Sequence, residues 1–145
     1  MFKIGILDLQ GGVEEHINTL EKIDTVLPVK VKNNKQLKEI DGLIIPGGES
    51  TTLMKLIKLY GFFEPIIKIS KEKPIWGTCA GMILSSRKYL NLIDIDIQRN
   101  AFGRQSASFV KTDLIPKISD NKIEMVFIRA PIIININNKV EVLKK

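Results

Sequence analysis

The sequence predicts an α/β fold in which a mostly parallel central sheet lies between two layers of helices, a three-layer αβα arrangement. Two observations support this prediction. Strand and helix patterns alternate through roughly the first ninety residues, which is typical of βαβ units with right-handed crossovers. Polar or glycine-rich segments also follow three of the predicted strands, where the sites of open α/β sheets form. Because the 145 residues contain no internal repeat and no long linker, we expect one domain over residues 1–145.

The first half of the chain supplies the alternating elements. Phe2–Leu9 alternates in hydrophobicity and is rich in Ile and Leu, so it predicts a strand. Two glycines end this strand, and apolar residues then repeat at helical spacing from Val13 to Leu20. We expect Ser50 to cap the next helix. The further elements predicted up to Lys88 are the strands Thr25–Val31, Leu43–Ile45 and Ile75–Trp76, and the helices Ser50–Tyr60, Phe62–Ser70 and Ala80–Lys88.

The second half of the chain predicts more strand and less helix. The polar segment Asn135–Asn138 predicts a surface turn. The strands predicted beyond Lys88 are Ile93–Gln98, Ser106–Leu114, Ile123–Ile128 and Val140–Leu143. We therefore expect the regular βαβ alternation to be confined to the N-terminal part of the chain.

The composition excludes several classes of function. The net charge is +6, from 22 basic and 16 acidic residues, but the lysines are scattered over predicted helix faces and aromatic residues are few, so nucleic-acid binding is not expected. No apolar run approaches the ~18 residues of a membrane span. The N-terminal segment predicts a first strand rather than a signal peptide. A single cysteine suits a reducing compartment, which indicates a cytoplasmic protein.

That cysteine, Cys79, lies in the segment Gly77-Thr78-Cys79-Ala80-Gly81, between a predicted strand and a predicted helix. A thiolate at a helix N-terminus is stabilised by the helix dipole and by free N–H groups. The N–H of Ala80 could then face an oxyanion formed by attack of the sulfur, as acyl transfer requires. A small buried cysteine used only for packing is the alternative. The flanking glycines, which allow tight backbone angles and leave space around the sulfur, favour a nucleophile.

Two other loops are expected at the same edge of the sheet. Gly47 and Gly48 follow the strand Leu43–Ile45, and glycines let a backbone N–H approach a substrate closely, so Gly48 is a second candidate oxyanion donor. Gln10 ends the first strand, and its amide could donate or accept there. Each feature alone is equally compatible with an ordinary turn or strand end. The convergence of three such loops favours a site.

Five segments, taken in order, resemble a known family. They closely resemble the class I glutamine amidotransferases, and within them the glutaminase subunits of pyridoxal 5'-phosphate synthases, over essentially the whole chain. The resemblance implies a class I glutamine amidotransferase fold of the flavodoxin-like kind. The segments are Leu9-Gln10-Gly11, Pro46-Gly47-Gly48-Glu49-Ser50-Thr51-Thr52, Gly77-Thr78-Cys79-Ala80-Gly81, Arg99-Asn100-Ala101-Phe102-Gly103-Arg104-Gln105 and Phe127-Ile128-Arg129-Ala130-Pro131.

The resemblance implies roles for individual residues. Cys79 would attack the side-chain amide of glutamine, giving a glutamyl thioester and ammonia. Gln10 would lie near the oxyanion site. An arginine fork suits the α-carboxylate of the substrate, and a carboxylate suits its ammonium group. The residues implied to bind glutamine are Gly47, Gly48, Glu49, Arg99, Ile128 and Arg129.

The resemblance also implies a partner and no cofactor. The ammonia would pass to a synthase subunit that builds pyridoxal 5'-phosphate, and glutaminase activity would be weak without that subunit. No metal site and no cofactor of the chain's own are expected.

The sequence departs from the family pattern at the catalytic base. The resemblance implies a His-x-Glu motif well after the cysteine, but no histidine follows Cys79, and the chain's one histidine, His16, is expected to be a packed or half-exposed residue of the first helix. We therefore expect a glutaminase domain that is incomplete at its C-terminus, lacking about a quarter of a typical domain.

Two other hypotheses remain open. A truncated, non-catalytic relative could bind the synthase subunit without hydrolysing glutamine. A different cysteine hydrolase or redox protein could use the same kind of sheet. The role of Arg104 is not assigned by any of these hypotheses.

Overall fold

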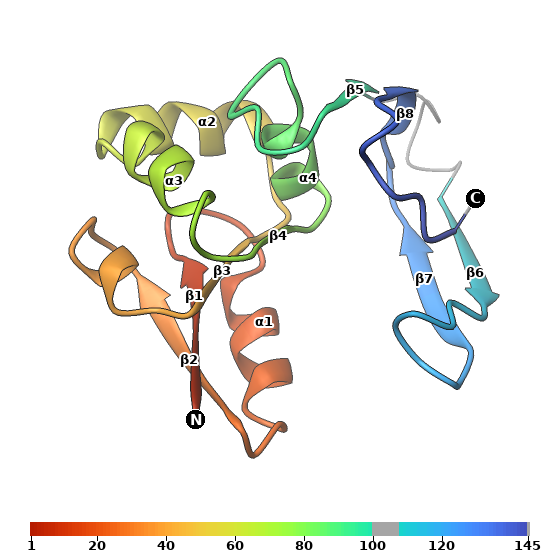
Figure 1. Ribbon diagram of the computed structural model, residues 1–145, viewed down its shortest axis with the longest axis horizontal. Coiled ribbons are helices and arrows are strands. Elements are labelled where there is room, and N and C mark those ends of the chain that lie inside the picture. Colours follow the sequence, from red (N-terminus) through yellow and green to blue (C-terminus); the bar gives the residue numbers. More distant parts are fainter. Residues whose placement is uncertain (100–107, 145) are drawn as a thin grey trace. The chain divides into compact units, whose positions relative to one another are not determined.

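The computed structural model describes residues 1–99 and 108–144 (Figure 1). Two compact units make up the chain, Met1–Ile93 and Asp94–Lys145, and each is described by itself. The expectation of one domain over residues 1–145 stays a prediction. The segment 100–105, which includes Arg104, and the first two residues of the predicted strand Ser106–Leu114 lie outside the described residues.

The first unit contains the predicted parallel sheet. Its strands are β1 (Phe2–Leu7), β2 (Val26–Val31), β3 (Gly42–Ile45) and β4 (Ile75–Gly77), in the order β2-β1-β3-β4. All neighbouring pairs are parallel, with Ile4 opposite Gly42 and Leu43 opposite Ile75. The chain therefore moves outward from β1 in both directions, as in doubly wound sheets that form sites where the strand order reverses.

Helices cover both faces of this sheet, which confirms the three-layer prediction. Successive residues of a strand point to opposite faces, so Leu7 enters a core with α2 (Ser50–Leu59), α3 (Phe63–Ile69), α4 (Ala80–Ser85) and the 3₁₀ turn η1 (Gln36–Lys38). Ile6 enters a smaller core on the other face with α1 (Val13–Leu20). Figure 1 shows these elements around the sheet.

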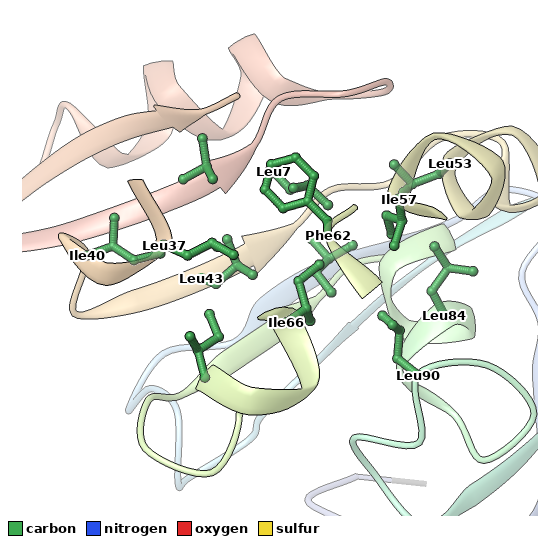
Figure 2. Close-up of a cluster of buried hydrophobic side chains, with 13 residues drawn as sticks. Leu7, Leu37, Ile40, Leu43, Leu53, Ile57, Phe62, Ile66, Leu84 and Leu90 are labelled. Carbon is green, nitrogen blue, oxygen red and sulfur yellow. The ribbon is translucent and has the colours of Figure 1, made fainter. Parts of the chain in front are cut away.

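The larger core is built around Phe62, between α2 and α3. Its side chain has no exposed surface, and neither have those of Leu53 and Ile57 from α2. Figure 2 shows Phe62 among labelled side chains that come from the sheet, η1 and three helices. This packing holds the helices against the strands whose ends carry the predicted site loops.

The N-cap of α2 differs from the prediction. Ser50 is the first helical residue and is buried, whereas Glu49 has the extended backbone of a cap, with φ −91° and ψ 111°. The Glu49 side chain accepts hydrogen bonds from the N–H groups of Thr51 and Thr52. The prediction of Ser50 as the cap was wrong because the longer carboxylate of the preceding residue satisfies two of the free N–H groups at once.

Helix α4 ends earlier than the predicted Lys88. Ser85 donates its hydroxyl to the Gly81 carbonyl at 2.8 Å, and Ser86 donates its hydroxyl to the Ile83 carbonyl at 2.7 Å. Ser86 has an extended backbone, with ψ 168°. Serine hydroxyls compete with helical backbone hydrogen bonds in this way, so the helix ends at Ser85.

The second unit consists of two antiparallel strand pairs. Strand β5 (Ile95–Gln98) pairs with β8 (Ile132–Ile136), and β6 (Phe109–Asp113) pairs with β7 (Ile123–Phe127). The rings of Phe109 and Phe127 stack across the second pair, with centroids 4.7 Å apart. Strands β5, β6 and β7 confirm three of the predicted strands, with shorter bounds.

Two predictions near the end of the chain were wrong. Asn135, predicted in a turn, lies in β8 opposite Asp96 and donates a side-chain hydrogen bond to its carboxylate at 3.2 Å. The isoleucines around Asn135 have high strand propensity, and pairing with β5 extends the strand past the asparagine. The predicted strand Val140–Leu143 is not formed. Within residues 1–99 and 108–144, no helix combines the length and apolarity needed to cross a bilayer.

Candidate functional site

Cys79 occupies a sharp turn between β4 and α4. Its backbone has φ 49° and ψ −107°, a conformation that residues with a Cβ rarely adopt. The side chain is exposed and its thiol is free. A strained, exposed residue between a strand and a helix is typical of a nucleophile turn, where the surrounding structure holds the side chain toward a substrate.

The two flanking glycines serve close packing. A Cβ on Gly77 would lie 2.4 Å from the carbonyl carbon of Gly81, and a Cβ on Gly81 would lie 1.9 Å from the carbonyl oxygen of Ile45. Neither glycine has a positive φ, so the prediction that they supply the tight backbone angles was wrong. Cys79 carries that angle itself, and the glycines let α4 begin directly against the sheet.

The Gly47-Gly48 loop lies against the cysteine, as predicted from the strand ends. A Cβ on Gly47 would lie 3.2 Å from the Cβ of Cys79. The Gly47 carbonyl accepts a hydrogen bond from the Gly12 N–H at 3.0 Å. Gly11 has φ 102°, and a Cβ there would lie 1.9 Å from the same carbonyl oxygen. Three strand-end loops therefore meet in the first unit, two of them in backbone contact.

Gln10 holds the next residues of that loop. Its side-chain oxygen accepts a hydrogen bond from the Glu49 N–H at 3.1 Å. A Cβ on Gly48 would lie 2.6 Å from this oxygen, so a side chain at Gly48 would displace the amide. The structure thus brings Gln10, Gly48 and Glu49 together. Ala80 begins α4, where the first N–H groups have no partner within the helix.

The carboxylate of Glu49 is a strong acid in this position. Hydrogen bonds from the N–H groups of Thr51 and Thr52, at 2.9 and 2.6 Å, lower its pKa to about 2. Glu49 is therefore ionised at neutral pH, at the N-terminus of α2. Its predicted contact with the substrate ammonium group stays a prediction.

His16 contacts the residue that precedes the cysteine, and no sequence pattern indicated this contact. The ring nitrogen Nε2 lies 3.0 Å from the Thr78 hydroxyl oxygen, and the ring meets Trp76 edge-on with centroids 6.2 Å apart. Partial burial lowers the pKa of His16, and the nearby Glu15 opposes that shift. The expectation of a half-exposed helix histidine is confirmed, but 62 residues separate His16 from Thr78, so only the fold reveals their hydrogen bond.

The remaining predicted residues lie in the second unit. Arg99 directly follows β5, and Ile128 and Arg129 directly follow β7; all three are exposed. Arg129 has φ 47°, so it shares with Cys79 a positive φ that is rare for residues with a side chain. The predicted roles of these residues in binding glutamine stay predictions, since each unit is described by itself.

Other possible sites lie away from these loops. A cavity of about 620 Å³ opens between η1 and α3, and none of its lining residues belongs to the three strand-end loops. In the part of the chain that the structure describes, no group of three or more His, Cys, Asp or Glu side chains is placed to hold a metal ion.

Comparisons with known proteins agree on one family. The model of the SNO glutamine amidotransferase family matches residues 6–145. A Clostridium botulinum (strain Loch Maree / Type A3) protein named pyridoxal 5'-phosphate synthase subunit PdxT is 46% identical over 153 aligned positions, covering 100% of this chain and 79% of that protein. A Clostridium kluyveri protein of the same name is 49% identical, covering 96% of this chain and 78% of that protein.

Solved structures are similar as well. A crystal structure described as a glutamine amidotransferase matches with a TM-score of 0.85 and 33% identity, covering 96% of this chain and 77% of that one. A putative GMP synthase protein from Thermoplasma acidophilum matches with a TM-score of 0.59 at 19% identity, covering 95% of this chain and 69% of that one, which supports the fold alone.

Proposed function

The chain belongs to the SNO glutamine amidotransferase family, and from this premise we propose that it is the glutaminase subunit of a pyridoxal 5'-phosphate synthase. In this role it hydrolyses glutamine to glutamate and passes the ammonia to a synthase subunit. The names of its relatives support the pathway. The observation that carries the chemistry is the strained, exposed Cys79 with the Gly47 backbone against it.

The proposed reaction proceeds through a covalent thioester. The Sγ atom of Cys79 attacks the carbonyl carbon of the glutamine side-chain amide. The C–N bond then breaks, and the nitrogen leaves as ammonia after gaining a proton. Water attacks the resulting glutamyl thioester, which releases glutamate and restores the thiol.

Backbone N–H groups are proposed to stabilise the oxyanion formed at each attack. The candidates are the N–H of Gly48, in the loop that lies against Cys79, and the N–H of Ala80 at the start of α4. Gln10 supports this arrangement because its hydrogen bond to the Glu49 N–H fixes the loop that contains Gly48.

Substrate binding is proposed to use charges on both units. The ionised Glu49 suits the ammonium group of glutamine, and Arg99 and Arg129 suit its α-carboxylate. The backbone of Ile128, beside Arg129, completes the proposed set together with Gly47 and Gly48.

A second candidate function is a binding module that docks on the synthase subunit without hydrolysing glutamine. The observation that favours it is that the single histidine, His16, is engaged with Thr78. A cysteine nucleophile normally needs a histidine base.

Ammonia release measured with and without the synthase subunit tests the first candidate. We expect glutamine-dependent ammonia only when the synthase subunit is added, and none from Cys79→Ala. We also expect a diazo or chloroketone analogue of glutamine to alkylate Cys79, as seen by peptide mass. Thr19→Ala, an exposed change on α1, serves as the control.

Each other outcome selects another hypothesis. Full activity in Cys79→Ala would overturn the mechanism. Co-purification with the synthase subunit without ammonia release would favour the binding module. No alkylation of Cys79 by glutamine analogues would favour a different cysteine hydrolase or a redox protein.

A further inference from the structure

We propose that His16 is a positioning residue for the nucleophile: through the Thr78 hydroxyl it holds the turn that keeps Cys79 in its strained, reactive conformation. This inference rests on the proposed function, because it takes Cys79 as the nucleophile. It assigns a role to the chain's one histidine that is distinct from that of a catalytic base.

The geometry of the contact supports a structural hold on the turn. His16 Nε2 lies 3.0 Å from the Thr78 hydroxyl oxygen, within ordinary hydrogen-bond distance. The ring also meets the edge of Trp76, two residues before Thr78. A single side chain from α1 therefore contacts both β4 and the first residue of the turn.

Thr78 is the point at which such a hold acts on Cys79. Its N–H donates to the Ile45 carbonyl at 3.1 Å, and its carbonyl accepts from the Gly81 N–H at 2.9 Å. These backbone bonds fix the peptide to β3 and α4. The hydrogen bond with His16 adds a third direction, from the opposite face of the sheet. A residue at φ 49° keeps that conformation only while its neighbours over-determine it.

The same helix also contacts the Gly47-Gly48 loop. Gly12, directly before α1, donates its N–H to the Gly47 carbonyl at 3.0 Å. Helix α1 is therefore anchored to both loops that flank the proposed reaction centre. Losing the His16 contact frees the nucleophile turn while the Gly12 anchor keeps the other loop in place, so the chemical step should suffer more than substrate binding.

The state of the imidazole is compatible with this role. Partial burial lowers the pKa of His16, which favours the neutral ring near pH 7, and Glu15 acts in the opposite direction. A neutral ring has one donor and one acceptor nitrogen, and the Thr78 hydroxyl can complement either one at Nε2.

Matched variants test the proposal in the complex with the synthase subunit. His16→Ala and Thr78→Val remove the hydrogen bond, whereas His16→Gln and Thr78→Ser can keep it. Thr19→Ala, which loses a hydroxyl bond within α1 at 2.7 Å and does not touch the turn, is the control. The readouts are kcat and KM for glutamine-dependent ammonia release, and the rate at which iodoacetamide alkylates Cys79 in the chain alone.

We expect His16→Ala and Thr78→Val to lower kcat about tenfold or more, because small displacements of a reacting group are costly, with KM within about twofold. Cys79 should be alkylated more slowly in both. His16→Gln and Thr78→Ser should restore most of kcat, and the double variant His16→Ala/Thr78→Val should be no worse than either single change.

Several results would overturn the proposal: kcat and alkylation in His16→Ala equal to those of Thr19→Ala, additive losses in the double variant, or no rescue by His16→Gln and Thr78→Ser. The alkylation rate separates this failure from failure of the proposed function. If Cys79→Ala kept its ammonia release, the nucleophile would be wrong, whereas the alkylation rates would still report whether His16 holds the turn.

Discussion

Cys79 carries the conformational strain of the site itself. Its φ of 49° stands between two glycines that have no positive φ. A glycine at position 79 would adopt this conformation more easily but would have no nucleophile, so the strain is the consequence of placing a thiol at the turn. The spacing of the segment predicted where the turn lies, and the structure shows which residue is strained.

Glu49 makes the stability of the chain depend on pH in the acid range. Its pKa is about 2 in the folded chain against an ordinary value of 4.5, so the folded state favours the ionised form. Its contribution to stability is therefore complete above about pH 4.5 and is lost as the pH falls toward 2. We expect the free energy of unfolding of the wild type to exceed that of Glu49→Gln by a margin that shrinks over this range.

Urea unfolding at several pH values would measure this margin. Glu72→Gln, which removes another exposed carboxylate outside any helix N-cap, is the matched charge control. A margin for Glu49→Gln that stays constant from pH 6 to about pH 3 would contradict the assignment of Glu49 as an ionised cap.

At the scale of elements, the contact between α4 and β3 depends on Gly81. A Cβ at this position would lie 1.9 Å from the Ile45 carbonyl oxygen, so either the helix or the strand must move. We expect Gly81→Ala to lower the free energy of unfolding by about 1–3 kcal/mol or more. It should also slow alkylation of Cys79, because α4 begins one residue after the cysteine.

Gly12→Ala is the control for this change. The nearest atom to a Cβ on Gly12 is the flexible Glu15 carboxylate oxygen at 3.3 Å, and its φ of −75° is allowed for alanine. Equal urea midpoints for Gly81→Ala and Gly12→Ala would show that α4 can move away from β3 without loss.

Some elements are tied together by contacts that no local pattern encodes. The Lys73 ammonium donates to the carbonyls of Leu37, Lys38 and Ile40, at 3.2, 3.1 and 2.6 Å, and so satisfies the end of η1. The turn η1 was not predicted, since a single 3₁₀ turn has no hydrophobic periodicity. Strand β8 was missed for a related reason, because its partner β5 lies 34 or more residues earlier in the chain.

At the scale of the whole molecule, the buried core is concentrated in the first unit. Among the described residues of the second unit, the buried hydrophobic side chains are Ile95 and Ile115. The first unit has two cores, one on each face of its sheet. The parallel sheet and its helices should therefore supply most of the resistance to unfolding.

Phe62 tests this distribution of stability. Its ring is fully buried where α2 meets α3, so Phe62→Ala should cost about 3–5 kcal/mol of unfolding free energy. Leu59→Ala removes an apolar side chain that is 75% exposed and should change stability by less than about 0.5 kcal/mol. Thermal unfolding monitored by circular dichroism would measure both, and similar midpoints for the two variants would contradict this view of the core.

Local sequence patterns were enough to establish the α/β class, the parallel sheet, the three strand-end loops and the family. These features are encoded in hydrophobic periodicity, in glycine-rich segments after strands, and in segments such as Gly77-Thr78-Cys79-Ala80-Gly81. They can be predicted from one sequence because each depends on residues that are neighbours along the chain.

Tertiary packing fixed what individual residues do within that plan. It made Glu49 rather than Ser50 the cap of α2, gave Gly81 a packing role, and joined His16 to Thr78 across 62 residues. Each of these outcomes depends on distances between groups that are remote in sequence or compete for the same N–H donors. Such distances exist only once the strands have paired and the helices have packed on them.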